Sequence, residues 1–213
     1  MRLVCSPAST AIALKLRAAI WPSLKTTVKF FQRRFVPLLR LLRRRLWLAV
    51  TTWPTRKDGI LIVQLLGVYA LIAIPVALLS DLTTIDLADL TWHKQGLVLF
   101  RVFVFPAFIE EGLWRVLLLP HKTEQVSDRR RWLIGLLTLV LFVAMHPVNG
   151  MTLFTDAAST FTNPFFLSLT TLLGLICMVS YWRSGSWWVP SIIHWAIVVA
   201  WLLVFDGYEQ LHN

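Results

Sequence analysis

The sequence predicts an all-α fold: a polytopic membrane helix bundle of about five transmembrane helices, preceded by a basic amphipathic N-terminal arm. Of the 213 residues, 57% are hydrophobic and only 15% are charged, whereas a typical soluble domain has about 25% charged residues. Several apolar runs reach the roughly 20 residues needed to cross a bilayer. The 11 tryptophans fit the same class, because indole rings favour the membrane–water interface.

The apolar runs define five candidate spans. The first is uniformly apolar, the second carries four charged residues, and the third is at the short limit for a span. The five segments are Ile60–Leu79, Gln95–Leu119, Trp132–Val148, Pro164–Trp182 and Trp187–Phe205.

The basic residues are distributed as expected for such a layout. Residues 1–57 contain 13 of the 21 lysines and arginines and no acidic residue. With alternating loops, 18 basic residues lie on the side of the N-terminus and only Lys94 lies on the other. The positive-inside rule therefore predicts an integral multi-pass protein with a cytoplasmic N-terminus, in a bacterial inner membrane or an organelle membrane. Membrane lipid, and not nucleic acid, is the partner that this charge predicts.

The charge pattern also divides the chain. We expect a basic arm at 1–57, cytoplasmic or on the membrane surface, and a transmembrane domain at 58–213 with its core at 95–205. Phe35–Val50 mixes apolar and basic residues at helical spacing, which favours a helix lying on the membrane surface. The basic, acid-free N-terminal segment also resembles an organelle transit peptide, but its serine content is modest. The two cysteines, Cys5 and Cys177, are expected to be packing residues.

Ionisable residues inside an apolar span are costly in a bilayer and indicate a functional site. Glu110, Glu111 and Arg115 lie in the second span. On an α-helix, Glu111 and Arg115 share a face and can pair, whereas Glu110 is turned by about 100° and is free to face a cavity. Gly112 would let another helix approach closely. A purely structural Glu–Arg pair is the alternative, but the second adjacent carboxylate favours chemistry.

Two histidines lie at compatible depths. His146 ends the third span and His194 lies within the fifth. At about 1.5 Å rise per residue, modest tilting would bring both into one layer with Glu110. Each histidine alone could equally be an interfacial or a hydrogen-bonded residue. The other histidines fall in loops or the tail and are expected to be solvated: His93, His121 and His212.

This combination of residues permits two hydrolytic chemistries. A carboxylate and a histidine can take a proton from water and so create a nucleophile for an amide carbonyl, while a second histidine donates to the developing oxyanion. Alternatively, two histidines and a glutamate are the ligand set of a catalytic zinc site. The first chemistry requires no cofactor, and the sequence does not exclude a zinc ion bound as in the second.

At these residues the chain resembles the CPBP family of intramembrane glutamic proteases, which includes type II CAAX prenyl endopeptidases and bacteriocin-processing or self-immunity proteins. The resemblance covers about Gln95 to Phe205, and three short motifs carry it in the family's order. The Glu-Glu-x-x-x-Arg motif matches Glu110, Glu111 and Arg115, the Phe-x-x-x-His motif matches Phe142 and His146, and the His-x-x-x-Asn motif is met only at His194.

The resemblance implies a role for each matching residue. Glu110 would be the general base, helped by His146, and Arg115 would orient Glu111. His194 would assist the oxyanion. Val198 stands where the family often has asparagine, and losing one oxyanion donor typically costs about 10²–10³ in rate. Ser191 and Asn149 are possible substitutes.

Three functions follow from this pattern. The first is an intramembrane endopeptidase acting on a membrane-associated peptide or protein. The second, motivated by Val198, is a catalytically weak or silent scaffold or immunity-type protein of the same family. The third is a proton-coupled carrier, because Glu, His and Arg in spans also build proton relays; it lacks the paired Gly/Pro-interrupted segments expected of inverted repeats.

Overall fold

The computed structural model describes residues 36–212 and confirms the all-α class. Apart from one isolated bridge between Asp86 and Phe205, the regular structure of these residues is helical. The chain order is α2 (Arg56–Leu79), α3 (Trp92–Val102), two π-helical segments η1 (Phe103–Glu110) and η2 (Gly112–Leu117), α4 (Asp128–Thr152), a 3-10 turn η3 (Thr155–Ala157), α5 (Ala158–Thr162), α6 (Pro164–Ser184), α7 (Trp188–Val204) and α8 (Gly207–His212).

Each predicted span corresponds to one helical stretch. Within the described residues, α2, α4 and α6 are long and apolar enough to cross a membrane, and α7 is a shorter apolar helix. The second predicted span is the continuous run of α3, η1 and η2. The chain is thus a helical membrane bundle, as its composition predicts.

The described residues divide into two units between Arg44 and Arg45. Residues 36–51 are helical, in agreement with the helix predicted at Phe35–Val50, and the division falls within this helix. Leu46 and Ala49 belong to a core cluster of the second unit. The end of the predicted basic arm is therefore part of the bundle; its placement on a membrane surface stays a prediction, and Cys5 lies outside the described residues.

Local sequence signals set the helix ends. Thr55 and Asp58 form a capping box at the start of α2, which satisfies two backbone N–H groups that have no helical partner. Asn163 caps α6, and Pro164 follows at the first helical position, where its missing N–H costs nothing. Gly185 ends α6 with a φ of 67°, a left-handed conformation that glycine adopts without steric cost.

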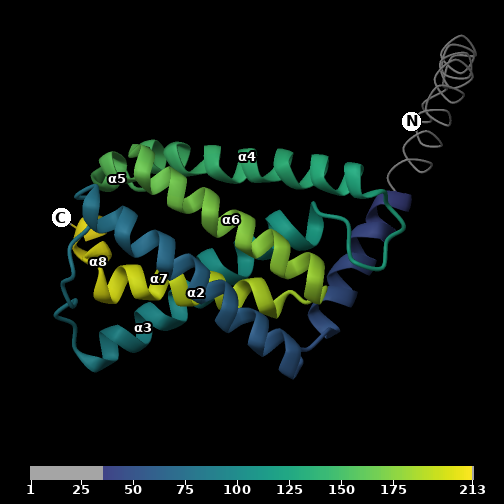
Figure 1. Ribbon diagram of the computed structural model, residues 1–213, viewed down its shortest axis with the longest axis horizontal. Coiled ribbons are helices and arrows are strands. Elements are labelled where there is room, and N and C mark those ends of the chain that lie inside the picture. Colours follow the sequence, from purple (N-terminus) through teal and green to yellow (C-terminus); the bar gives the residue numbers. More distant parts are fainter. Residues whose placement is uncertain (1–35, 213) are drawn as a thin grey trace, which may run out of the picture. The chain divides into compact units, whose positions relative to one another are not determined.

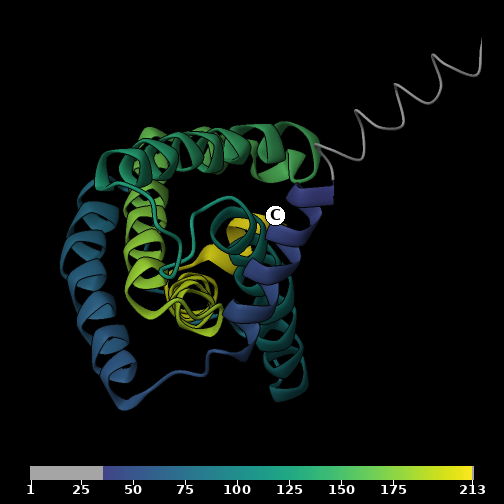
Figure 2. The same cartoon turned by 90° about the vertical axis from the view of Figure 1, so that its right-hand side faces the viewer.

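Helix α6 holds the bundle together. It contacts α2, α4, α7 and η2, and Figures 1 and 2 both show it running alongside α4 and α2. Small residues permit the close approach: a Cβ on Gly174 would collide with Leu139 and Phe142 of α4. Cys177 of α6 is fully buried, which agrees with the packing role predicted for it.

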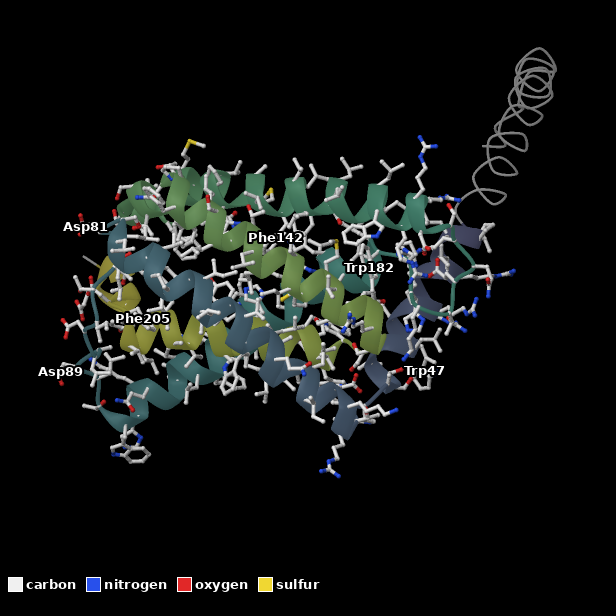
Figure 3. All side chains as sticks on the ribbon, viewed as in Figure 1. Trp47, Asp81, Asp89, Phe142, Trp182 and Phe205 are labelled. Carbon is white, nitrogen blue, oxygen red and sulfur yellow. The ribbon has the colours of Figure 1, made fainter. Side chains whose placement is uncertain are left out.

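The two ends of this unit differ in charge. Figure 3 labels Asp81, Asp89 and Phe205 at one end and Trp47 at the other, with Phe142 between them. At the acidic end, the backbone of Asp86 pairs with the end of α7. At the basic end, Lys122 donates a hydrogen bond to the carbonyl of Ser184. The loops thus gather at the two ends as the alternating charges predict, and the assignment of the basic end to the cytoplasm stays a prediction.

The expectation that His121 is solvated is wrong. Its side chain is 1% exposed, and its Nε2 lies 3.1 Å from the carbonyl oxygen of Gly185. The loop folds over it because Arg45 donates two hydrogen bonds to Glu124, at 2.6 and 2.7 Å. Burial disfavours the charged form of Glu124, but the bonds from Arg45 and from the His121 backbone N–H outweigh this effect and lower the pKa of its carboxyl group.

Gly112 permits the close approach that its position predicts. A Cβ there would overlap the Trp187 ring, which stacks on Phe108 at 4.1 Å between ring centroids and donates from Nε1 to the Phe108 carbonyl at 2.8 Å. The indole is thus held from two sides and has little freedom to move away.

We expect Gly112→Ala to destabilise the protein by about 1–3 kcal/mol, the usual cost of overpacking a core. Gly67→Ala is the matched control, because a Cβ on Gly67 of α2 would meet nothing within 4 Å. Thermal unfolding of both variants in the same detergent measures the difference. Equal midpoints would contradict the close packing of Gly112 against Trp187.

Candidate active site

The second helical stretch loses its α-helical form where the carboxylates lie. Hydrogen bonds of the π type run through η1 and η2, and Glu111 joins the two segments. Pro106 lies inside η1, and proline lacks the N–H that an α-helical ladder needs at that point. Segments of π-helix are rare and occur frequently at functional sites. The α-helical geometry predicted for this stretch is therefore wrong at Glu110 and on both sides of Glu111.

Glu111 is the fixed carboxylate of the site. Its Oε2 lies 3.0 Å from Nε of Arg115 in an ion pair, and its Oε1 lies 2.8 Å from Nδ1 of His194. Glu111 is 0%, Arg115 3% and His194 2% exposed. The sequence predicts the pairing of Glu111 with Arg115; the structure adds His194 of α7, which lies 83 residues away. Ionised groups buried this deeply require such partners.

The ring of Phe142 on α4 contacts the side chains of Arg115, His146 and His194. Its ring lies under the guanidinium of Arg115, at 4.5 Å from Cζ to the ring centroid. The same ring makes edge contacts with His146 at 4.9 Å and His194 at 6.4 Å between centroids. In the sequence, Phe142 stands out only as part of a motif, because an apolar residue in an apolar span gives no separate signal. Arg115 is fixed further by a 3.2 Å hydrogen bond to the Gly174 carbonyl.

His146 is half-buried on α4, and its ring contacts the ring of Phe142, which in turn contacts Arg115 and His194. Its Nδ1 lies 2.9 Å from the Phe142 carbonyl oxygen. Because a carbonyl oxygen can only accept, Nδ1 carries the hydrogen, and in the neutral ring Nε2 has the free lone pair. By the same reasoning, the carboxylate of Glu111 places a hydrogen on Nδ1 of His194. Both histidines thus use Nδ1 for orientation and leave Nε2 for other partners.

Glu110 is the carboxylate without a fixed partner. Its charge interacts with those of His194, Glu111 and Arg115, so it belongs to the same cluster. Within residues 36–212, however, its carboxylate forms no hydrogen bond or ion pair, and the side chain is half-buried. The predicted pairing of one carboxylate with Arg115 is therefore present, and its neighbour has no partner among the described residues; that Glu110 faces a cavity stays a prediction.

The position of the motif asparagine offers no polar group here. Val198 lies one turn after His194 on α7 and is half-buried. Of the two possible substitutes, Ser191 is fully buried and its hydroxyl donates to the Trp187 carbonyl at 2.9 Å. Asn149 follows His146 by three residues on α4, which places the two on one helix face.

The zinc alternative has no matching ligand set in the described part of the chain. Among residues 36–212, no group of three or more His, Cys, Asp or Glu side chains is arranged to hold a metal ion. One ring nitrogen of each site histidine is already engaged, with Glu111 and with a backbone carbonyl.

The fold and the site together define a polytopic helical membrane protein with a buried Glu–Arg–His cluster and an adjacent open carboxylate. Residues 92–200, about half of the chain, match the family described as Type II CAAX prenyl endopeptidase Rce1-like. The chain belongs to this family, which is a family of CAAX-type intramembrane proteases. No curated protein and no solved structure matches the chain.

Proposed function

We propose that the protein is an intramembrane endopeptidase in which Glu110 activates water for attack on a peptide bond of a membrane-associated substrate. The observation that carries the proposal is the difference between the two adjacent carboxylates in the contacts that they make. Glu111 is ion-paired with Arg115 and contacts His194, whereas Glu110 beside it has no fixed partner among the described residues. A general base must be free to reach the proton that it removes.

The remaining groups supply the steps that hydrolysis needs. Glu110 takes a proton from water, and the resulting hydroxide oxygen attacks the carbonyl carbon. Nε2 of His146, with its lone pair free, accepts a hydrogen bond from the same water. When protonated, His194 presents an N–H at Nε2 to the oxyanion, while Glu111 stabilises the imidazolium ring. The proton held by Glu110 then passes to the leaving amide nitrogen as the C–N bond breaks.

Replacement of His146 tests the proposal. We expect His146→Ala to lower cleavage by about 10²-fold, the lower end of the range for a group that assists proton transfer. The assay uses proteoliposomes and a pool of prenylated and acylated peptides, with products identified by mass spectrometry. His93→Ala is the control, because His93 is exposed at the start of α3 and should leave the rate unchanged. Cleavage by His146→Ala at the wild-type rate would contradict the proposed role.

The same assay separates the alternatives. A chelator should leave a glutamate–histidine enzyme active and should inactivate a zinc enzyme. A catalytically silent scaffold is favoured by one observation, the apolar Val198 in place of a hydrogen-bond donor. It predicts that wild type and all variants are equally inactive, and that Val198→Asn gains nothing. A proton-coupled carrier would require proton-dependent uptake by the reconstituted protein.

A further inference from the structure

A cavity separate from the candidate active site opens at the basic end of the bundle. Its volume is about 410 Å³, within the range of small-molecule sites. It lies between the first turns of α2, the segment that precedes them, and the turns around Lys122 and Arg183. None of the predicted catalytic residues lines it. The lining residues that matter below are Trp53, Lys57, Leu61, Gln64, Lys122 and Arg183.

The charge of this cavity favours an anion. Three cationic side chains line it, from Lys57, Lys122 and Arg183. The carboxylate of Asp58 is the opposing charge, but it accepts hydrogen bonds from the backbone N–H and hydroxyl of Thr55, at 2.8 and 2.7 Å. With three cations against one carboxylate, the cavity has a net positive charge, and its cations come from three different parts of the chain.

The surroundings of the cavity favour a lipid over a free anion. Leu61 lines the cavity, and the neighbouring α2 side chains Ile60 and Val63 are 53% and 70% exposed on a helix long and apolar enough to span. Trp53 is 68% exposed and stacks on Trp188 at 4.9 Å. A tryptophan just before the start of a membrane span, as Trp53 is before α2, is typical of the lipid headgroup level. Basic pockets between transmembrane helices are known to bind anionic lipid headgroups.

We propose that this cavity binds the phosphate-bearing headgroup of an anionic phospholipid, whose acyl chains lie along α2. Lys57, Lys122 and Arg183 would contact the phosphate, and Gln64 would hydrogen-bond to the headgroup. The lipid would fasten the start of α2 to the turn after α6, at the end of the bundle opposite Asp81 and Asp89 (Figure 3). This site does not depend on proteolytic activity.

Native mass spectrometry of the detergent-purified protein, titrated with phosphatidylglycerol, tests the proposal. A detergent micelle presents no anionic membrane surface, so we assign the contribution of about fivefold per basic residue only to a Lys or Arg that contacts the bound headgroup. We therefore expect Lys57→Gln and Arg183→Gln each to weaken binding roughly fivefold, and the double variant roughly 25-fold. Gln64→Trp keeps every charge but fills the cavity, and should weaken binding as strongly as the double variant.

Arg56→Gln is the matched control, because Arg56 is the exposed neighbour of Lys57 and does not line the cavity. It should bind phosphatidylglycerol like wild type. Phosphatidylcholine should bind weakly, and inorganic phosphate and glycerol 1-phosphate should fail to compete, since they lack acyl chains. Equal weakening by Arg56→Gln would indicate general surface attraction and overturn the proposal. Competition by inorganic phosphate at the affinity of the lipid would also overturn it, in favour of a free-anion site.

Discussion

Replacing Glu110 by glutamine is expected to lower peptide cleavage by about 10²–10⁴-fold, the contribution of a general base. The amide keeps the size of the side chain but cannot take a proton from water. Folding should be unaffected, because the Glu110 carboxylate has no fixed partner among the described residues. The thermal midpoint should stay the same or rise slightly, since the change removes a charge that burial disfavours, together with its attraction to His194 and Arg115 and its repulsion by Glu111. Cleavage in proteoliposomes and thermal unfolding measure the two effects.

A matched control for this prediction is Asp89→Asn, the same chemical change in an exposed loop residue at the acidic end. It should retain full activity. If the Glu110→Gln protein cleaved at the wild-type rate while Glu111→Gln did not, the base would be Glu111 and the assignment of the two carboxylates would be reversed. If both variants cleaved normally, neither carboxylate would take part in the reaction.

Replacing Arg115 by methionine should cost about 3 kcal/mol of stability, the lower end of the 3–5 kcal/mol typical when a buried ion pair loses one partner. The change leaves Glu111, which is 0% exposed, with His194 as its remaining partner. It also removes the hydrogen bond to Gly174 and the contact with the Phe142 ring. Denaturant unfolding in mixed micelles measures the loss.

The double variant Arg115→Met with Glu111→Gln separates charge from packing. Neutralising Glu111 removes the uncompensated buried charge, so most of the lost stability should return, whereas cleavage should stay impaired because His194 has lost the carboxylate that orients it. Arg129→Met is the control, since Arg129 is exposed in the first turn of α4. Similar stability of the Arg115→Met and Arg129→Met proteins would show that the buried pair contributes little.

The sequence was sufficient to predict the helices and part of the site. Hydrophobic runs are local signals, and the pairing of Glu111 with Arg115 follows from their spacing along one helix. The contact of Glu111 with His194 could not be derived, because nothing local relates residues on separate helices. Phe142 has no distinguishing chemistry in an apolar span. The burial of His121 was missed because a loop residue is expected to be solvated unless another part of the chain, here Gly185, covers it.

The π-helical form of residues 103–117 has a consequence for how this region can change. An α-helix turns by about 100° per residue. Each π turn holds one residue more than an α turn, and this extra residue sets the direction of the side chains after the turn relative to those before it. If a π turn closed to ordinary α-helix with its full number of residues, the carboxylates that follow would turn by about 100° and leave the cluster, whereas closing it with one residue deleted would leave their direction unchanged. The π turns and the number of residues ahead of Glu110 are therefore matched, and a change in either one alone would move the carboxylates out of the cluster.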